Sequence, residues 1–439
     1  MRMRLTTVVT ACALLCSPIL ARAAESEPAT AQLSADQRAA ALSAIEAAFR
    51  DKYVFPEMRP KILERLSTAR SSGRYDVDDP RAFADRVTED LQEVSHDKHV
   101  WMRVDPAAYA AASAPPDSDA GEEAYWRRQA LRNNHGLTEM KILGGNIRYL
   151  KISGFEWVAD VTGTAYDGAM RFLSGGDAAV IDLRGNGGGT HESVRYLVSH
   201  FLPGDVLEMT FLQGSKPPEQ SRTLDHLAAG RLQGKPLYVL IDGGVASAAE
   251  AFAYDVQQFK LGELVGTRTA GAANNNELLP VAPEFILSIS YGRPVHALSN
   301  ANWEGEGVAP TLEASSEQAL QVAQVHALAR LSREPGATDE QRRDYAWAQV
   351  AAEASLHPIA VQAGRLRGLA GRYGRYEVTL RDGALWLARP NRPTARLSAL
   401  SADGLFAIDS VDSVRVRLTG KALELLRADE PSPRVFPRG

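Results

Sequence analysis

The hydrophobic pattern of the chain changes character twice. Over residues 31–95, apolar side chains recur at helical spacing, as in LSADQRAAALSAIEAAFRDKYV, and Ser34 precedes the first helix as a candidate cap. From about residue 140, short apolar runs such as AAVIDL and PLYVLID alternate with amphipathic helical stretches. Beyond about residue 360 the pattern is one of short alternating strands. This order predicts a helical region, an α/β region and an all-β region.

The middle region predicts a mixed, largely parallel sheet with flanking helices. Its strands are apolar on both faces and are separated by helices, which is typical of βαβ units. Two of these strands end in glycine-containing loops, DLRGNGGG at 182–189 and DGGVAS at 242–247. Loops at this edge of a parallel sheet are where the chemistry of such folds is found. The stretch DPAAYAAASAPPDSDAGEE at 105–123 predicts a loop, because it is rich in Pro, Ala and Asp.

The end of the chain predicts a small β domain. YEVTLRDGALWLAR indicates a hairpin, because its Asp-Gly pair fits a type I′ turn. We therefore divide the chain into an N-terminal leader at 1–23, a helical subdomain at 24–140, an α/β domain at 141–330, a helical linker at 331–360 and a small C-terminal β domain at 361–439.

Composition argues against some classes of partner. The 439 residues are 45% hydrophobic and 23% charged, which is ordinary for a globular protein of several domains. The formal net charge of −5 argues against nucleic acid or an anionic membrane as the main partner, because both require a basic surface.

The leader predicts a secretory signal peptide. MRMR supplies positive charge, LTTVVTACALLCSPIL is apolar but too short to span a membrane, and an A-x-A pattern ends at Ala23. Both cysteines, Cys12 and Cys16, lie inside it, so the expected mature chain has neither a disulfide nor a thiol nucleophile. A lipoprotein with Cys12 as the lipidated residue is the alternative. We expect a periplasmic or secreted protein.

The stretch SAAE at 247–250 has two interpretations. Ser-x-x-Glu before a helix is the pattern of a capping box. Ser247 also follows a buried strand and two glycines, in a turn that would expose its side chain beside the free N–H groups of a helix N-terminus. Ser247 would then be a nucleophile, with the N–H of Ala248 binding the oxyanion. Gly188 or its neighbour could supply a second N–H.

Other readings of the glycine loop are weaker. No Gly-Lys-Ser/Thr follows DLRGNGGG, which argues against a nucleotide-binding P-loop. Asp182 and Arg184 are expected to pair with each other and brace the loop.

A serine nucleophile needs a base, and histidine is the usual one. His96 and His99, in SHDKHVWM, lie where a helix gives way to a strand, and His191 and His200 are rivals after the glycine loop. His-x-x-His with Asp97 between its histidines is also a metal pattern, but a weak one without a third ligand. We expect neither a metal nor a cofactor.

DLRGNGGG, VASAAE and WEGEGVAP, in this order, resemble family S41 of the serine peptidases. That family includes the C-terminal processing (tail-specific) proteases, tricorn protease and interphotoreceptor retinoid-binding protein. The resemblance covers roughly residues 140–315, with LQEVSHDKHVWMRV as a further patch. It implies a ClpP/crotonase-like core, Ser247 as the nucleophile, and an oxyanion hole lined by Gly188 and Gly189.

The chain departs from the tail-specific branch of this family, which uses a Ser/Lys dyad. The position of the family lysine falls on Ala272, and the nearest lysine, Lys260, ends the preceding helix as an expected surface charge. The segment between His99 and the strand near residue 147 is also too short for a PDZ domain.

The tricorn-like branch instead uses Ser, His and Glu. Its histidine ends a helix and enters a strand, which matches His99, and its glutamate precedes Gly-Val-x-Pro, which matches Glu304, with Glu306 as a rival. A serine directly precedes the histidine in that branch, whereas this chain has Lys98. The Ser-His pair at 95–96 therefore stays open as an alternative.

The sequence thus predicts a serine endopeptidase that acts on peptides or proteins. Ser247 would be the nucleophile, His99 the base and Glu304 the group that orients it. The alternatives are a binding protein for hydrophobic ligands on the same fold, as in the retinoid-binding relatives, and an esterase. No membrane span is expected in the mature chain, and its oligomeric state stays open.

Overall fold

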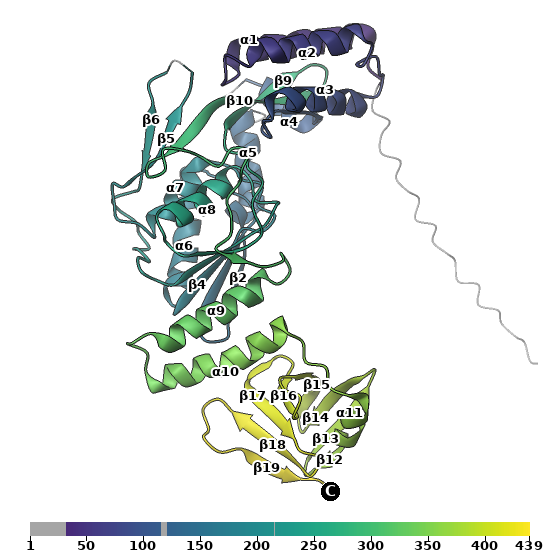
Figure 1. The fold of residues 1–439 in the computed structure, drawn as a ribbon, viewed down its shortest axis with the longest axis vertical. Coiled ribbons are helices and arrows are strands. Elements are labelled where there is room, and N and C mark those ends of the chain that lie inside the picture. Colours follow the sequence, from purple (N-terminus) through teal and green to yellow (C-terminus); the bar gives the residue numbers. More distant parts are fainter. Residues whose placement is uncertain (1–31, 116–120, 215) are drawn as a thin grey trace, which may run out of the picture.

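The molecule is an elongated crescent with helices at one end, an α/β body in the middle and a β domain at the other end (Figure 1). The structure, a computed structural model, describes residues 32–115, 121–214 and 216–439. The predicted signal peptide and both cysteines lie outside these residues. Within them, no helix is long and apolar enough to cross a membrane.

The predicted N-terminal helices are confirmed, and they pack on a distant hairpin. The elements are α1 (Ala35–Lys52), α2 (Arg59–Ser71), α3 (Pro80–Ser95), β1 (Trp101–Val104), β9 (Asn275–Val281) and β10 (Phe285–His296). Ser34 caps α1 in a capping box with Gln37. β1 pairs with β10, and Phe83 of α3 packs on Phe285 of β10. The helical end of the crescent therefore shares one core with a hairpin from the later sequence.

The prediction of a loop over 105–123 was wrong for 106–113 and 122–123, which are helical, while 116–120 lie outside the described residues. The stretch contains helix α4 (Pro106–Ser113), followed by α5 (Glu122–Arg132) and the short 3-10 helix η1 (Asn134–Gly136). Asp105 caps α4 by accepting the N–H of Ala108 at 3.0 Å, and proline occupies the first turn, where its missing N–H costs nothing. Five of the eight residues of the helix, PAAYAAAS, are alanine, the best helix former.

The α/β body contains a six-stranded sheet in the order β11-β8-β7-β4-β3-β2. Its elements are β2 (Leu137–Leu143), β3 (Ile147–Ile152), α6 (Thr162–Ser174), β4 (Ala178–Asp182), α7 (His191–Ser199), β7 (Leu237–Ile241), α8 (Ala248–Gln258), β8 (Glu263–Gly266), β11 (Leu312–Glu313) and α9 (Ala319–Arg333). All pairs are parallel except β2–β3. Helices α6, α7 and α8 pack on one face and α9 on the other, which buries both sides of β4 and β7.

A second sheet adjoins the α/β body. β5 (Leu207–Leu212) pairs with β6 (Glu219–Arg222) and with the last residues of β10. Because the first part of β10 pairs with β1 and β9, this one long strand joins the helical end of the molecule to the α/β body.

The β domain is a meander of eight antiparallel strands that nearly closes into a barrel. Helix α10 (Asp339–Leu356) precedes it in the chain. The domain itself comprises α11 (Ala363–Leu369), β12 (Gly371–Tyr373), β13 (Tyr376–Arg381), β14 (Ala384–Arg389), β15 (Arg392–Ala399), β16 (Leu405–Ile408), β17 (Val411–Leu418), β18 (Ala422–Arg427) and β19 (Arg434–Pro437). Asp382 and Gly383 both have positive φ, 48° and 76°, which confirms the predicted hairpin. A bridge between Tyr373 and Arg438 links the first strand to the end of the chain.

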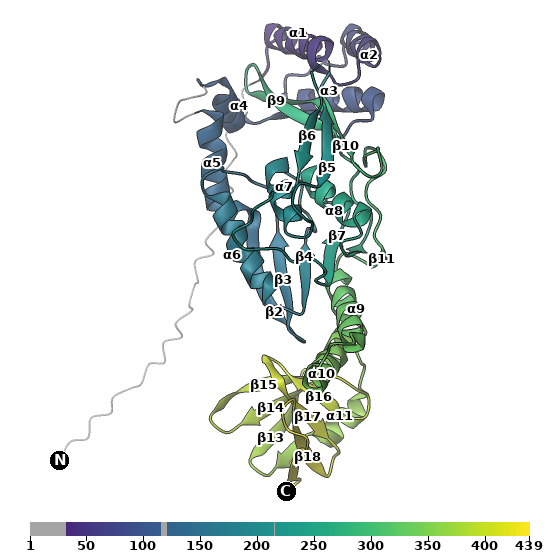
Figure 2. The same cartoon turned by 90° about the vertical axis from the view of Figure 1, so that its left-hand side faces the viewer.

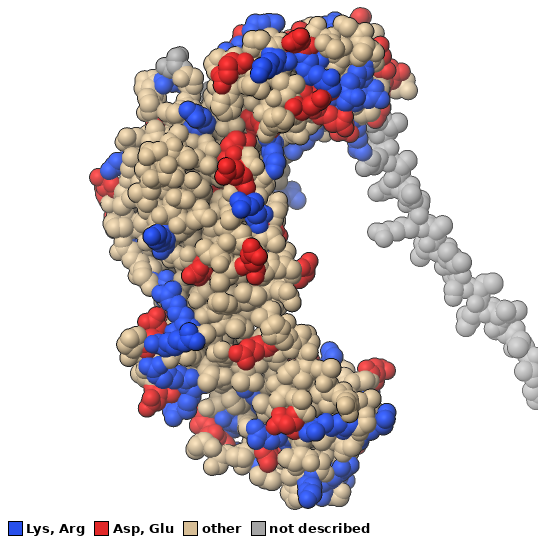
Figure 3. All heavy atoms as spheres, in the orientation of Figure 1, with Lys and Arg blue, Asp and Glu red and all other residues tan. Residues whose placement is uncertain are grey.

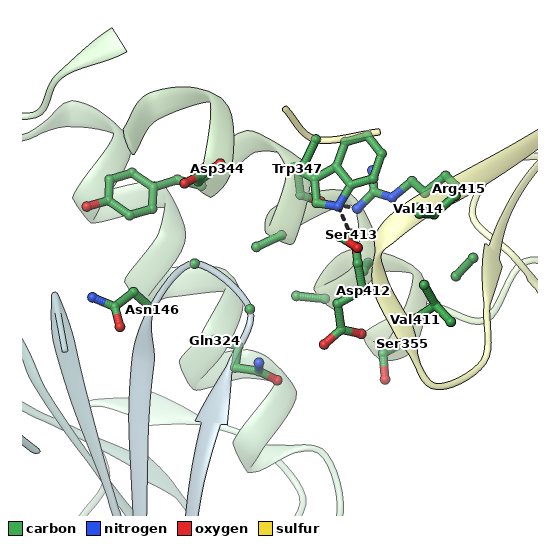
Figure 4. Close-up of a pocket in the computed structure, with 18 of the residues that line it drawn as sticks. Asn146, Gln324, Asp344, Trp347, Ser355, Val411, Asp412, Ser413, Val414 and Arg415 are labelled. Carbon is green, nitrogen blue, oxygen red and sulfur yellow. Dashed lines mark hydrogen bonds between the residues drawn. The ribbon is translucent and has the colours of Figure 1, made fainter. Parts of the chain in front are cut away.

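Helices α9 and α10 lie between the sheet of the body and the β domain (Figure 2). A cavity of about 470 Å³ opens at this junction (Figure 4). There the guanidinium of Arg415 stacks 3.9 Å from the ring centre of Trp347, whose Nε1 donates to the carbonyl of Asp412 at 2.8 Å. These contacts hold the β domain against α10. The described residues that line the cavity include no histidine.

Charges of both signs are interspersed on the face shown in Figure 3. They are dense at the two ends of the crescent and sparse over its middle, and Lys and Arg gather along the left edge at the level of α9 and α10, with Asp and Glu beside them.

Candidate active site

The two glycine-containing loops meet at the C-terminal edge of the parallel sheet, as the sequence predicts. β4 and β7 are neighbours, so their following loops are adjacent. Asp242 Oδ1 accepts the N–H groups of Gly185 and Gly244, each at 3.0 Å, and the N–H of Ala246 donates to the carbonyl of Asn186 at 3.0 Å. These bonds fix one loop against the other.

The predicted pairing of Asp182 with Arg184 is confirmed. Arg184 Nε donates to Asp182 Oδ1 at 2.9 Å, and the hydroxyl of Tyr149 donates to Asp182 Oδ2 at 2.7 Å. Burial alone would raise the pKa of Asp182, but these hydrogen bonds outweigh it and lower that pKa. The pair braces the start of the glycine loop.

Ser247 has a strained backbone at the N-terminus of α8. Its φ of 54° and ψ of −122° are unusual for a residue with a side chain, and such strain is concentrated at functional sites. Its N–H donates to the carbonyl of Ala272 and to Glu250 Oε2, both at 3.1 Å. Ser247 lines a pocket of about 410 Å³ together with Gly189 and Ala248. The turn therefore has the features of a nucleophile elbow, while Glu250 satisfies the backbone as in a capping box.

The glycine loop packs directly under Ser247. A Cβ on Gly188, where φ is 107°, would lie 2.7 Å from the Cβ of Ser247 and 3.0 Å from the nitrogen of Ala248. The N–H of Gly188 donates to Asn186 Oδ1 at 2.9 Å. Within the described part of the chain, the N–H groups of Gly189 and Ala248 have no hydrogen-bond acceptor. Two free N–H groups thus flank the serine.

His99 lies in a buried cluster with two carboxylates. Its side chain is 7% exposed and its Nδ1 has no hydrogen-bond partner. One nitrogen of His99 and one oxygen each of Asp97 and Glu304 lie within 4.8 Å of one another. Burial lowers the pKa of the imidazole, and the Asp97 charge opposes this. His96, at the left-handed C-cap of α3, is exposed and lies outside the cluster.

Asp97 and Glu304 are held by hydrogen bonds from the surrounding backbone and side chains. Asp97 accepts the N–H of His99 at 2.9 Å and Asn274 Nδ2 at 3.1 Å. Glu304 Oε2 accepts the N–H groups of Ala273 and Asn274 at 2.6 and 3.0 Å, whereas its Oε1 is buried without a partner. Burial, followed by the Asp97 charge, raises the pKa of Glu304 to about 7.

The segment 270–274 joins the serine to the histidine cluster. The carbonyl of Ala272 accepts the N–H of Ser247, Asn274 bonds Asp97 and Glu304, and Lys98 Nζ donates to the carbonyl of Ala270. No direct hydrogen bond joins Ser247 to His99 among the described contacts. Ala272 is buried beside the serine, so the position of the family lysine adjoins the site but offers only a methyl group. Lys260 is exposed, as predicted.

His191 lies in the same pocket as Ser247. Its Nε2 is 3.0 Å from both Glu208 Oε1 and Ser221 Oγ. In a catalytic triad the serine and the carboxylate contact different ring nitrogens of the histidine, whereas Glu208 and Ser221 both contact Nε2 of His191. Ser221 also lies within β6 and not at a helix N-terminus. This group therefore lacks the geometry of a catalytic triad. His200 is fully buried, with Nδ1 on the carbonyl of Tyr196.

Glu250 has a larger structural role than a helix cap. Its buried carboxylate accepts hydrogen bonds from Thr269 Oγ1 at 2.5 Å and from the N–H groups of Gly271 and Ala272 at 2.6 and 2.8 Å, besides that of Ser247. Burial raises the pKa of Glu250 by more than these hydrogen bonds lower it, so the pKa lies above its usual value. This single side chain therefore ties the serine turn to the segment that leads to the histidine cluster.

Replacement of Glu250 by alanine is expected to destabilise the protein by roughly 3 kcal/mol or more, because several buried donors lose their acceptor. Urea denaturation monitored by circular dichroism measures the change. Glu306→Ala is the matched control, since Glu306 is an exposed glutamate on the Glu304 loop. Equal stability of the two variants would contradict this role.

Comparison with known proteins identifies the family. Residues 146–314 match peptidase family S41, and residues 30–126 match the N-terminal domain of Peptidase_S41 in eukaryotic IRBP. The carboxy-terminal processing protease CtpB of Bacillus subtilis (strain 168) is 28% identical over 180 residues, 40% of this chain and 35% of that protein. The carboxy-terminal-processing protease of Bartonella bacilliformis (strain ATCC 35685 / KC583 / Herrer 020/F12,63) is 27% identical over 133 residues, 30% of each.

The chain thus spans about a third of the length of these curated relatives. A solved structure of a lipoprotein from Streptococcus agalactiae aligns with a TM-score of 0.46 at 14% identity, covering 68% of this chain and 98% of that one. The two matched segments contain the serine turn, the glycine loop and the histidine cluster, and residues 30–126 and 146–314 of this chain belong to peptidase family S41.

Proposed function

We propose that this protein is a serine peptidase in which Ser247 attacks the scissile carbonyl of a peptide. The observation that carries the proposal is the strained serine at a helix N-terminus, connected through segment 270–274 to a buried histidine and two carboxylates. The match to family S41 supports the same activity.

In this mechanism His99 takes the proton of Ser247 and returns it to the leaving amine. A buried imidazole with a lowered pKa is neutral at physiological pH, which is the form that a base requires. Glu304 would accept the Nδ1 proton through its free Oε1, since both atoms are buried without partners. Substrate binding has to bring the imidazole to Ser247, because no direct hydrogen bond joins them beforehand; such contacts often tighten only in the substrate complex.

The oxyanion would be bound by two backbone N–H groups. Ala248 supplies one, as the sequence predicts. We propose Gly189 as the second donor, because the N–H of Gly188 is engaged with Asn186, whereas Gly189 lines the pocket. Gly188 instead provides the close approach under Ser247. Each donor contributes on the order of 3 kcal/mol to lowering the barrier.

We propose the same organisation and location as the sequence predicts: a ClpP/crotonase-like peptidase domain at 141–330, flanked by the N-terminal subdomain, the linker and the C-terminal β domain, in a chain exported to the periplasm or beyond the cell. With Ser, His and Glu in these roles, the proposed mechanism would be that of the tricorn-like side of the family. The pocket beside Ser247 presents both apolar and polar side chains, among them Phe211, Trp303 and Asn274, which suits a peptide segment.

Hydrolysis of a peptide library and of simple esters by the purified chain tests this function. We expect cleavage of peptide bonds that is blocked by covalent serine reagents. Turnover of esters alone would support the esterase alternative. Tight binding of a hydrophobic fluorophore with no turnover of either substrate would support the binding-protein alternative.

A further inference from the structure

The cluster around His99 holds more acidic groups than a catalytic triad needs. Asp97 is 2% exposed, and it adds a second carboxylate to the His99–Glu304 pair. Within the described part of the chain, this is the sole group of three or more histidine, cysteine, aspartate or glutamate side chains whose ligand atoms converge so closely. His99 Nδ1 and Glu304 Oε1 are both buried without a hydrogen-bond partner, so each of these side chains has one uncommitted ligand atom.

No positive side chain balances these carboxylates. Glu304 experiences the charges of Asp97 and Glu250, and no lysine or arginine among the described residues forms an ion pair with Asp97 or Glu304. The nearest lysine in the sequence, Lys98, donates instead to the carbonyl of Ala270. Burying like charges together is costly unless a proton or a cation joins them. The site therefore has a deficit of positive charge that a divalent cation would fill.

The donor set selects the kind of cation. One imidazole nitrogen with two carboxylate oxygens is a ligand set that Zn²⁺ and similar transition-metal ions accept, whereas Ca²⁺ and Mg²⁺ prefer oxygen alone. Bonds of about 2.0–2.2 Å to the metal would bring the ligand atoms to about 3.5 Å from one another. Since these atoms already lie within 4.8 Å of one another, each pair would have to approach by on the order of 1 Å at most.

We propose that Asp97, His99 and Glu304 form a binding site for one Zn²⁺-like divalent ion. The His-x-x-His pattern at 96–99 contributes only Asp97 and His99 to this site, because His96 is exposed. The third ligand, Glu304, comes from a loop that is distant in the sequence. This part of the inference rests on the proposed function, in which His99 is the base. A metal ion bound to the imidazole of His99 would inhibit the peptidase reversibly, because that imidazole could not accept the proton of Ser247. Metal removal by a chelator would restore activity.

Isothermal titration of Zn²⁺ into the full-length Ser247→Ala variant tests the site without requiring activity. We expect one ion per chain in that background, and at least a roughly tenfold weaker affinity after adding His99→Gln or Asp97→Asn. His96→Ala, which removes an exposed histidine three positions away, is the matched control and should leave the affinity unchanged. Circular dichroism of each metal-free variant verifies its fold.

A second readout separates this proposal from the proposed function. Co²⁺ in a site with an imidazole ligand gives a visible absorption band, and we expect the band to disappear in His99→Gln and to persist in His191→Ala. Zn²⁺ binding that is unaffected by His99→Gln and Asp97→Asn, or no binding at all, would overturn the metal site. Specific binding without inhibition of the wild-type chain would uphold the site and contradict the assignment of His99 as the base.

Discussion

Replacement of Ser247 by alanine is expected to lower kcat/KM for a peptide substrate by about 10³- to 10⁶-fold. Removing the nucleophile of a serine peptidase leaves only the oxyanion hole and substrate binding. The fold should survive, because alanine keeps the Cβ that packs on Gly188, and the backbone N–H that bonds Glu250 is unchanged. Steady-state hydrolysis of a fluorogenic peptide measures the rate, and thermal unfolding measures the fold.

Ser221→Ala is the matched control, since Ser221 lines the same pocket and also contacts a histidine and a glutamate. We expect it to change kcat/KM by much less than Ser247→Ala. A Ser247→Ala protein with wild-type activity, or a Ser221→Ala protein without any, would show that the nucleophile is assigned wrongly.

Replacement of His99 by alanine is expected to reduce kcat by roughly 10⁴-fold or more, because the serine then loses its base. His96→Ala should retain activity close to that of the wild type, since His96 is exposed at the end of α3. Kinetics with a chelator present keep metal effects out of this comparison.

The His191→Ala variant tests whether His191, and not His99, is the base. His191 shares the pocket with Ser247, but its Nε2 is committed to Glu208 and Ser221. A moderate effect on KM with kcat largely kept would fit a wall of the substrate pocket. If His191→Ala abolished turnover while His99→Ala did not, His191 would be the base and the proposed triad would be wrong.

Local sequence signals predicted much of the fold. The buried strands β4 and β7 and the helices that follow them are evident from apolar runs and helical periodicity, and the Asp-Gly hairpin between β13 and β14 from turn chemistry. Helix α4 was missed because its Pro-Ala-rich sequence suggests a loop, whereas Asp105 and the first-turn proline initiate a helix.

The pairing of β1 with β10 could not be predicted, because long-range strand partners leave no local signal. That pairing seats the N-terminal helices, and with them His99, on the hairpin that follows segment 270–274. The sequence therefore indicates a histidine at a helix-to-strand junction without showing what surrounds it.

The sequence also predicted part of the candidate site, but not the contacts between its residues. Ser247, Ala248 and the glycine loop follow from the motif and the strand order. The structure adds that the N–H of Gly188 is already engaged by Asn186, which no spacing reveals. The roles of Asp97 beside His99 and of Glu250 as acceptor for the segment before Asn274 depend on three-dimensional contacts.

The most direct test of the central claim, that Ser247 is a nucleophile activated by His99, is covalent labelling by a fluorophosphonate probe with the labelled residue located by mass spectrometry. The account predicts one label per chain, on Ser247, which is absent from Ser247→Ala and forms far more slowly in His99→Ala. A label on Ser221 or another residue, or a rate of labelling at Ser247 that is unchanged by His99→Ala, would contradict it.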